Sequence, residues 1–509
     1  MRVLADNFGS PDLIDVAIAL SKRGFNFIYI NGKSKACDLL KNNQQYFKDT
    51  IFHDYTDALA GIPAPEVDVS SFRPLGTDLI HPLSLYESSV LSMMTRIDFD
   101  NLDFSEKQYR YYQYVWYWYN VLSILKPDIV IFRDVPHVAY NTVLYYIAKQ
   151  LGIKTVIFRK FSCIMYRVVY QHDLFDYKEI REEYQRLKLA KIGEQDVDNS
   201  LKDFYNGLNY IHTEKGFSKQ YMAISRFAGK EKAVEVFPKF DRVLKNIKNY
   251  TFFSTFFNYL RLLFHRFEIC SINKKTELGL TIKWRNFWHA RVRARFRKEY
   301  ESLQVNNVDF SRPYIYMPLH RQPEGSTNPM GGIFDNQILA IDLLAATLPE
   351  GWLLYVKEHP TQWRFPLAHL GRYNNYYRLI NRHKNIRLIS TAVSGFDLID
   401  HSKAVATITG TAGFEAIMRG KPALIFGFPS YRDCEGVLQV SNFNDCLEAV
   451  KKVYDGYIPD KMNVLRFMQA AKNMTVNAYI NIYHGRNSGL SYEQNIKNLT
   501  DGLYKACLS

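Results

Sequence analysis

Residues 404–428 constrain the fold most, because their sequence, AVATITGTAGFEAIMRGKPALIFGF, has the pattern of a complete β-α-β unit. An apolar strand at 404–408 leads through the Gly/Thr turn 409–413 into a short helix that ends at Gly420, and a second apolar strand follows. Apolar runs this short around a helix are typical of parallel strands covered on both faces. The segment therefore predicts an α/β sheet of the doubly wound kind.

The turn at 409–413 is also a candidate anion site. Its small residues let backbone N–H groups approach a ligand closely, and the helix that follows contributes the positive end of its dipole. We expect a phosphate at Thr411 to Gly413. The alternative is that Thr409 and Thr411 only cap the helix and that Glu415 only complements its dipole. The turn by itself leaves both interpretations open.

A chain of 509 residues is too long for one hydrophobic core, so two α/β domains with a connecting segment are expected. The first domain is predicted at 1–170 and the second, which contains the unit above, at 306–465. Residues 171–305 are predicted to form a helical connection rich in aromatic and basic residues. Residues 466–509 have a helical pattern and are expected to cross back to the first domain.

Two loops of the first domain carry polar residues where strands are expected to end. The loop after the first strand offers Asp6, Asn7 and Gly9 as acceptor-site candidates, although a plain helix start explains it equally well. A later predicted strand ends just before Asp134 and His137, and a carboxylate with an imidazole is the pattern of a catalytic base and its partner. A proline-containing loop that simply leads into the next helix is the alternative.

Charge and aromatic content limit the partners of the chain. Lys and Arg number 65 against 51 Asp and Glu, and the net charge of +14 favours an anionic partner. Aromatic and basic residues alternate at 251–298, which is typical of a helix lying in a membrane interface. A helical linker with a solvated arginine face and an RNA-binding segment are the alternatives. We expect peripheral membrane contact through 251–298 and no nucleic-acid partner.

Cysteines and hydropathy predict the compartment. The six cysteines are scattered without a C-x-x-C pair, so neither disulfides nor a zinc site is predicted and a reducing compartment is expected. No apolar run has the length of a membrane span, so we expect a cytoplasmic protein on the inner face of the plasma membrane. The D-x-D triples at 98–100 and 196–198 do not clearly follow core strands, and neither a metal nor a cofactor is predicted.

Three polar turns of the second domain are expected to meet at one edge of its sheet. They are the loop 320–327, the turn at 357–360 and the turn at 409–413. Arg321, Lys357 and His359 supply cations or hydrogen-bond donors, and Glu415 supplies a carboxylate for hydroxyl groups. This set suits a nucleotide-sugar, and two Rossmann-like domains would form a cleft for donor and acceptor.

The motifs LHRQPEGSTNP, YVKEHP and ITGTAGFEAIMRGKPALIFG, in this order and spacing, resemble the capsule polysaccharide biosynthesis glycosyltransferases. That family includes bacterial transferases of Kdo (3-deoxy-manno-octulosonic acid), and the His-Pro turn also resembles the motif that bacterial sialyltransferases use on the phosphate of a CMP-sugar. The resemblance covers about 310–440 well and the first domain only in layout.

The resemblance implies a metal-independent transferase of the two-domain GT-B type in capsule or O-antigen (lipopolysaccharide) biosynthesis. It would transfer Kdo or another acidic sugar from a CMP-activated donor to a glycan or lipid-linked glycan acceptor. His359 with Lys357 would hold the donor phosphate, and Gln322 and Glu324 would face the sugar. The donor-binding residues expected in all are Arg321, Gln322, Lys357, His359, Thr409, Gly410, Thr411 and Glu415.

The catalytic group stays open among Asp134, His137 and Glu324. Transfer requires a base that deprotonates the acceptor hydroxyl, or a carboxylate nucleophile if configuration is retained. Two other functions are compatible with the sequence. One is an epimerase of the UDP-GlcNAc 2-epimerase type, although the aromatic and basic segment argues against it. The other is a non-catalytic scaffold or anionic-polymer binder in capsule assembly.

Overall fold

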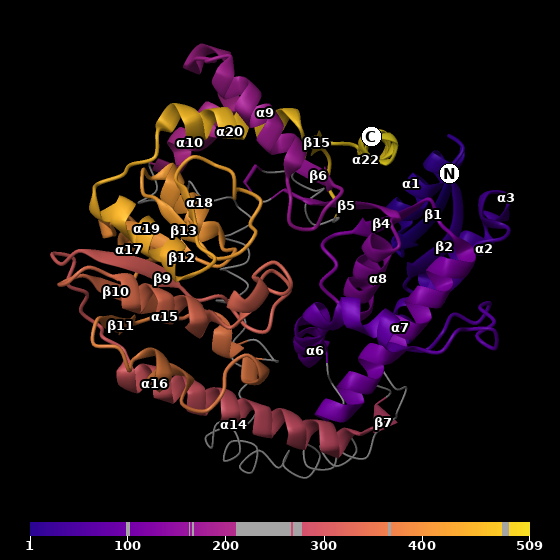
Figure 1. Cartoon of the computed structure of the whole chain (residues 1–509), viewed down its shortest axis with the longest axis horizontal. Coiled ribbons are helices and arrows are strands. Elements are labelled where there is room, and N and C mark those ends of the chain that lie inside the picture. Colours follow the sequence, from indigo (N-terminus) through magenta and orange to yellow (C-terminus); the bar gives the residue numbers. More distant parts are fainter. Residues whose placement is uncertain are drawn as a thin grey trace, which may run out of the picture.

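Two large sheets organise the chain, one on each side of Figure 1, the first mostly parallel and the second fully parallel. The structure, a computed structural model, describes residues 1–97, 102–161, 163–164, 167–209, 266–267, 277–364, 368–480 and 488–509. Each sheet is buried between helices, as its apolar strands require. The prediction of an α/β fold with two Rossmann-like domains is confirmed.

The sheet of the first domain has the order β15-β6-β5-β4-β1-β2-β3. Its strands are β1 (Arg2–Asp6), β2 (Asn26–Gly32), β3 (Ile51–Asp54), β4 (Ile129–Arg133), β5 (Lys154–Lys160), β6 (Arg167–Gln171) and β15 (Val476–Asn477). The strands β1 to β5 are parallel, whereas β6 and β15 are antiparallel to their neighbours. The order reverses between β1 and β4, and a doubly wound sheet binds its ligands at such a point.

The sheet of the second domain is fully parallel, with the order β11-β10-β9-β12-β13-β14. Its strands are β9 (Tyr314–Pro318), β10 (Leu353–Lys357), β11 (Ile386–Ile389), β12 (Ala404–Thr407), β13 (Ala423–Ile425) and β14 (Val437–Gln439). This is the Rossmann strand order. Helix α18 (Thr411–Met418) joins β12 to β13, so the β-α-β unit predicted at 404–428 is present.

Helices cover both sheets. Those of the first domain are α1 (Pro11–Ser21), α2 (Lys35–Lys41), α3 (Gln44–Phe47), α4 (Tyr55–Leu59), α5 (Thr77–Ile80), α6 (Ser84–Ile97), α7 (Phe104–Leu125) and α8 (Ala139–Gln150). Those of the second are α15 (Gln337–Thr347), α16 (Tyr376–Ile380), α17 (Gly395–His401), α18 and α19 (Phe443–Tyr454). Tyr111, Tyr114, Tyr117 and Trp118 of α7 are buried in the first core, so these aromatic rings serve packing.

The chain passes between the domains more than once. Helices α9 (Lys178–Leu189) and α10 (Asn199–Asn209) pack with α20 (Lys461–Asn473) beside the second domain (Figure 1). The chain then returns, because β15 pairs with β6 and α22 (Tyr492–Leu508) packs against α1. Helix α14 (Gly279–Leu303) contacts α16, and the short strands β7 (Arg266–Phe267) and β8 (Glu277–Leu278) pair with each other.

A loop of the second domain contacts α6 of the first. The Ser89 hydroxyl donates to Asn328 Oδ1 at 2.8 Å, and Asn328 Nδ2 donates to the Ser89 carbonyl at 3.2 Å. Met330 of the same loop belongs to the apolar core of the first domain. The carboxyl ends of the second sheet are therefore held against the first domain.

Two predictions concern residues that are wholly or partly outside the described ones. The D-x-D triple at 98–100 lies outside them, as does half of the segment 251–298. The other triple is engaged elsewhere, since Asp196 accepts a hydrogen bond from the Gly193 backbone N–H at 2.8 Å and Asp198 forms an ion pair with Lys472. Among the described residues, no group of three or more His, Cys, Asp or Glu could hold a metal ion. None of the described helices combines the length and apolar character of a membrane span.

Candidate active site

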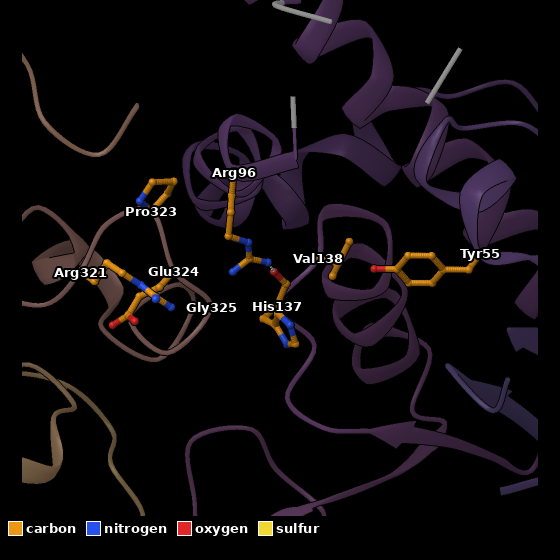
Figure 2. Close-up of a pocket in the computed structure, with 8 residues that line it drawn as sticks. All are labelled: Tyr55, Arg96, His137, Val138, Arg321, Pro323, Glu324 and Gly325. Carbon is orange, nitrogen blue, oxygen red and sulfur yellow. Dashed lines mark hydrogen bonds between the residues drawn. The ribbon is translucent and has the colours of Figure 1, made fainter. Parts of the chain in front are cut away.

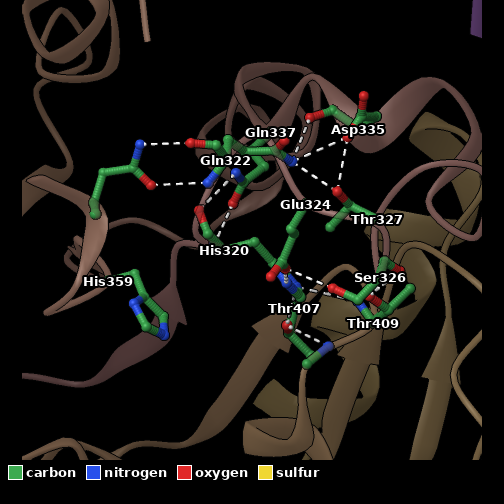
Figure 3. Close-up of polar contacts among 12 residues, drawn as sticks. His320, Gln322, Glu324, Ser326, Thr327, Asp335, Gln337, His359, Thr407 and Thr409 are labelled. Carbon is green, nitrogen blue, oxygen red and sulfur yellow. Dashed lines mark hydrogen bonds and ion pairs between the residues drawn. The ribbon is translucent and has the colours of Figure 1, made fainter. Parts of the chain in front are cut away.

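The three polar turns of the second domain lie side by side because β10, β9 and β12 are neighbours in the sheet. The Thr409 hydroxyl donates to the Ser326 carbonyl at 2.9 Å, which joins the third turn to the first (Figure 3). The Thr409 backbone N–H points to His320 Nε2 at 3.3 Å. The loop after β9 and the turn before α18 therefore form one unit.

His320 is the centre of this unit. Because Nε2 accepts from Thr409, the proton lies on Nδ1, which donates to Glu324 Oε1 at 3.0 Å. The Thr407 hydroxyl lies 3.2 Å from Nε2 on the other side. Burial alone would raise the pKa of Glu324, but hydrogen bonds from His320 and Ser326 lower it below its ordinary value. Glu324 is thus a fixed, weakly basic carboxylate.

Gln322 braces the loop from inside. Its side-chain nitrogen donates to Thr327 Oγ1 at 2.7 Å and to Asp335 Oδ1 at 3.0 Å. Its backbone N–H donates to Gln362 Oε1, and Gln362 Nε2 donates back to the Gln322 carbonyl, both at 2.8 Å. The Gln322 side chain, which the resemblance places toward the sugar, is directed into this internal network (Figure 3).

A buried ion pair lies behind the loop. Arg372 Nε and Nη2 each donate to a Glu358 carboxylate oxygen at 2.9 Å, and the two side chains are 1% and 0% exposed. The Tyr377 hydroxyl donates to the same carboxylate at 2.5 Å. Arg372 Nη2 also donates to the His320 carbonyl at 2.9 Å, so the pair fixes the position of His320.

The turn after β10 places two of the predicted donor-binding residues near this loop. Lys357 is buried, its Nζ donates to the Val393 carbonyl, and burial lowers its pKa to about 8. His359 Nδ1 accepts a hydrogen bond from the Thr361 backbone N–H at 3.2 Å. Burial lowers the pKa of His359, although the negative charges of Glu358 and Glu324 oppose the effect.

The turn before α18 has the geometry of a helix start. The Gly410 backbone N–H donates to Thr407 Oγ1 at 3.2 Å, and the exposed Thr411 hydroxyl donates to Glu415 Oε1 at 2.9 Å. Burial raises the pKa of Glu415. A Cβ atom on Gly413 would lie 2.4 Å from the Tyr431 hydroxyl oxygen, so this close packing requires glycine.

An open pocket of about 300 Å³ lies between the two domains (Figure 2). It is lined by Tyr55, Arg96, His137, Val138, Arg321, Pro323, Glu324 and Gly325. His137 Nδ1 donates to the Val135 carbonyl at 2.5 Å, which leaves Nε2 unprotonated in the neutral ring. Burial lowers the pKa of His137, so the imidazole is neutral near pH 7 and can accept a proton.

Asp134 directs the turn that carries His137. Its φ angle is 75°, a left-handed conformation that is uncommon outside glycine, and its Oδ1 accepts from the Val135 backbone N–H at 2.8 Å. The negative charge of Asp134 acts to raise the pKa of His137. Asp134 therefore lies beside the imidazole without lining the pocket.

The pocket brings together three of the predicted site residues: His137, Arg321 and Glu324. The other donor-binding candidates also belong to the second domain but do not line the pocket. Asp6, an acceptor-site candidate, is fully buried and accepts hydrogen bonds from Tyr140 and Asn141 at 2.9 Å. Burial raises the pKa of Asp6 to about 6, and the side chain braces the start of α8 from beneath.

Several residues of the site are absent from the sequence predictions. His320 lies two residues after the end of the apolar strand β9, and a polar residue at that position is the sequence signal that could have indicated it. Arg372 and Glu358 are fourteen residues apart in sequence and have no shared motif. Tyr55 and Arg96 enter the pocket only because the domains dock, which no local pattern indicates.

The comparisons with known proteins support the resemblance in the second domain. Residues 335–466 match the family described as capsule polysaccharide biosynthesis protein. No match is found among curated proteins. The match contains the second and third of the three motifs, and it confirms the family resemblance for this part of the chain.

Similar solved structures are distant. The UDP-GlcNAc 2-epimerase from Methanocaldococcus jannaschii is 12% identical, with 93% of this chain and 98% of that chain covered and a TM-score of 0.27. The beta Kdo 2,7 transferase of KpsC from Thermosulfurimonas dismutans is 10% identical, with 73% of this chain and 84% of that chain covered and a TM-score of 0.28. Its beta Kdo 2,4 transferase has 14% identity, 74% and 86% coverage and a TM-score of 0.29. These scores are low, and the fold assignment rests on the strand order of the chain itself.

Proposed function

We propose that the chain is a glycosyltransferase of bacterial surface polysaccharide biosynthesis. The proposal starts from the second domain, which matches the capsule polysaccharide biosynthesis family. The observation that carries the proposal is the pocket between the domains, where His137 of the first domain faces Arg321 and Glu324 of the second. A transferase requires this arrangement, because donor and acceptor must meet at one catalytic group.

The second domain is proposed to bind a CMP-activated acidic sugar, such as Kdo. The start of α18 offers N–H groups and a positive dipole end to a phosphate, and Lys357 and His359 lie at the end of β10, two strands away from β12 in the sheet. Thr409, Gly410 and Thr411 would line the nucleotide and Glu415 would accept from the ribose hydroxyls. Arg321 of the same domain lines the pocket and would contact the sugar end of the donor.

His137 is the proposed catalytic base. Its neutral Nε2 removes the proton of the acceptor hydroxyl while the acceptor oxygen bonds to the anomeric carbon of the sugar. The bond from that carbon to the phosphate oxygen breaks, and the nucleotide leaves with the electron pair. Asp134 stabilises the imidazolium that forms, and the donors of the second domain stabilise the charge on the phosphate. Glu324 stays ionised beside the sugar.

Membrane contact is proposed for the described part of the basic segment. Trp288, Arg291, Arg295 and Lys298 are exposed and recur at helical spacing along one face of α14. Trp288 is 49% exposed, which is unusual for a large aromatic side chain. An anionic lipid surface on the cytoplasmic side would accept the cations and the indole ring, and it would supply a lipid-linked glycan acceptor.

The test is thermal melting of the full chain with CMP, CDP, UDP, GDP and ADP. CMP at about 100 times its Kd should stabilise the fold by about 2.7 kcal/mol and raise the midpoint by roughly 5 to 10 °C. His359→Ala should lose this shift, whereas His401→Ala, an exposed histidine of the same domain, should keep it. An unchanged shift in His359→Ala would remove the site assignment. A shift with UDP alone would point to another donor or to an epimerase, and no shift at all would favour the scaffold.

A further inference from the structure

Arg96 is a cation of the pocket that the proposed transfer does not yet use. It lies near the end of α6, and its side chain enters the pocket from the first domain, while Arg321 enters from the second (Figure 2). Its Nη2 donates to the His137 carbonyl. Within the described part of the chain no hydrogen bond involves Arg96 Nε or Nη1. Among the residues that the structure describes, no other group occupies these donors next to the proposed base.

The carboxylates near Arg96 are held by other groups. Both hydrogen bonds that Glu324 receives from described residues, from His320 and Ser326, go to Oε1. Asp335 accepts from Thr327 at 2.8 Å and from Gln322 at 3.0 Å. Neither carboxylate forms an ion pair with Arg96 among the described residues. Burial lowers the pKa of Arg96, although the negative charges of Asp335 and Glu324 oppose this, so its charge is incompletely compensated.

The backbone of the second domain closes tightly over this cation. A Cβ atom on Gly325 would lie 2.7 Å from Arg96 Nη1 and 2.7 Å from His137 Cδ2. The guanidinium and the imidazole therefore contact the same residue of the loop. A group bound to Arg96 would lie beside His137, within the same pocket of about 300 Å³.

We propose that Arg96 binds an anionic group of the acceptor glycan, either a carboxylate or a phosphate ester, and so places the acceptor hydroxyl against His137. This inference rests on the proposed transferase function. Arg96 belongs to the first domain, opposite the donor turns, so its ligand is the acceptor rather than the donor. A guanidinium is suited to this task because its planar N–H donors match the oxygens of carboxylates and phosphates.

Binding of small acceptor analogues tests the proposal. The first pair of probes is the methyl glycoside of Kdo and its carboxyl methyl ester, and the second pair is a hexose methyl glycoside with and without a 6-phosphate. Each probe is titrated with the full chain in the presence of CMP, and binding is measured by saturation-transfer NMR. The wild type should bind one acid roughly 10-fold to 100-fold more tightly than its neutral counterpart. The acid that shows the preference identifies the anion as carboxylate or phosphate.

Variants assign the preference to one side chain. Arg96→Gln should lose most of it and Arg96→Lys should keep part, whereas Arg186→Gln, which removes an exposed arginine of α9, should behave as the wild type. Equal binding of acids and neutral analogues by the wild type, no binding of any probe, or a preference that survives in Arg96→Gln would each overturn the proposal. The CMP melting shift is measured on the same proteins, so loss of acid preference with a normal shift removes only the role of Arg96. No nucleotide shift in the wild type removes the transferase function itself.

Discussion

Replacing Glu358 with glutamine tests whether a buried ion pair holds the candidate donor site together. The Glu358 and Arg372 side chains are 0% and 1% exposed and are joined by two hydrogen bonds of 2.9 Å. The neutral amide removes the negative charge and leaves the Arg372 guanidinium buried without its counterion. Breaking one partner of such a pair costs about 3–5 kcal/mol. For a domain of this size the loss lowers the melting midpoint by roughly 6 to 20 °C.

Glu301→Gln is the matched control. It is the same substitution in an ion pair with Arg297 on α14, where the side chains are 45% and 60% exposed. Solvent screens such a pair, so about 0.3–0.5 kcal/mol and a shift below roughly 2 °C are expected. Differential scanning calorimetry of both variants gives the comparison. Equal midpoints in the two variants would refute the assignment of the pair as a structural support.

Glu358→Gln should also weaken nucleotide binding. Arg372 Nη2 donates to the His320 carbonyl at 2.9 Å, and His320 contacts Glu324 and the turn before α18. Loss of the carboxylate frees Arg372 to move, and the loop moves with it. Well below its midpoint, Glu358→Gln should bind CMP about tenfold or more weakly than Glu301→Gln by isothermal titration. Equal affinities would mean that the pair supports stability alone.

Three further perturbations test the site. His137→Gln should lower kcat by about 100-fold or more, and wild-type kcat should fall on the acid side as the imidazole protonates. Burial holds the pKa of His137 in the folded protein below its value in the unfolded chain. The contribution of His137 to the free energy of unfolding is therefore present above the unfolded pKa and is lost as pH falls through the folded pKa. His137→Gln should not show this loss of stability. Gly325→Ala should raise the acceptor KM by about tenfold or more with the CMP melting shift unchanged, since its Cβ would lie 2.7 Å from Arg96 and His137 atoms; an unchanged KM would contradict the packing. Lys357 has a folded pKa of about 8, below its unfolded value, so wild-type stability should rise above pH 8, and Lys357→Met should melt without that rise.

The arrangement of the second sheet could be predicted from local patterns. The segment 404–428 alternates apolar strands with a helix, and polar turns follow each predicted strand. Parallel strands end at one edge, so the turns after β9, β10 and β12 had to lie near one another once the strands are neighbours. The position of a residue in the sequence was therefore enough to predict that it lies on one of these turns.

The contacts that decide what each side chain can do could not be predicted in this way. Gln322 is as polar as its neighbours, yet its amide is used inside the loop by Thr327 and Asp335. Asp6 is the last residue of β1 and Asp134 comes just after β4, but Asp6 is covered by Tyr140 and Asn141. Arg96 reaches His137 only because α6 packs against α8 within the first domain. These outcomes depend on long-range packing, which a pattern in the sequence does not record.

The pairing of β15 with β6 has a consequence for synthesis of the protein on the ribosome. Val168 of β6 pairs with Val476, a residue made about 300 positions later, which at 5–20 residues per second is a delay of roughly 15 to 60 s. Until then one side of β6 presents unpaired backbone groups, which are a template for aggregation. We therefore expect the nascent first domain to be more prone to aggregation during this interval unless a chaperone covers this edge. Expression at reduced temperature, or with a holdase supplied, should increase the soluble yield.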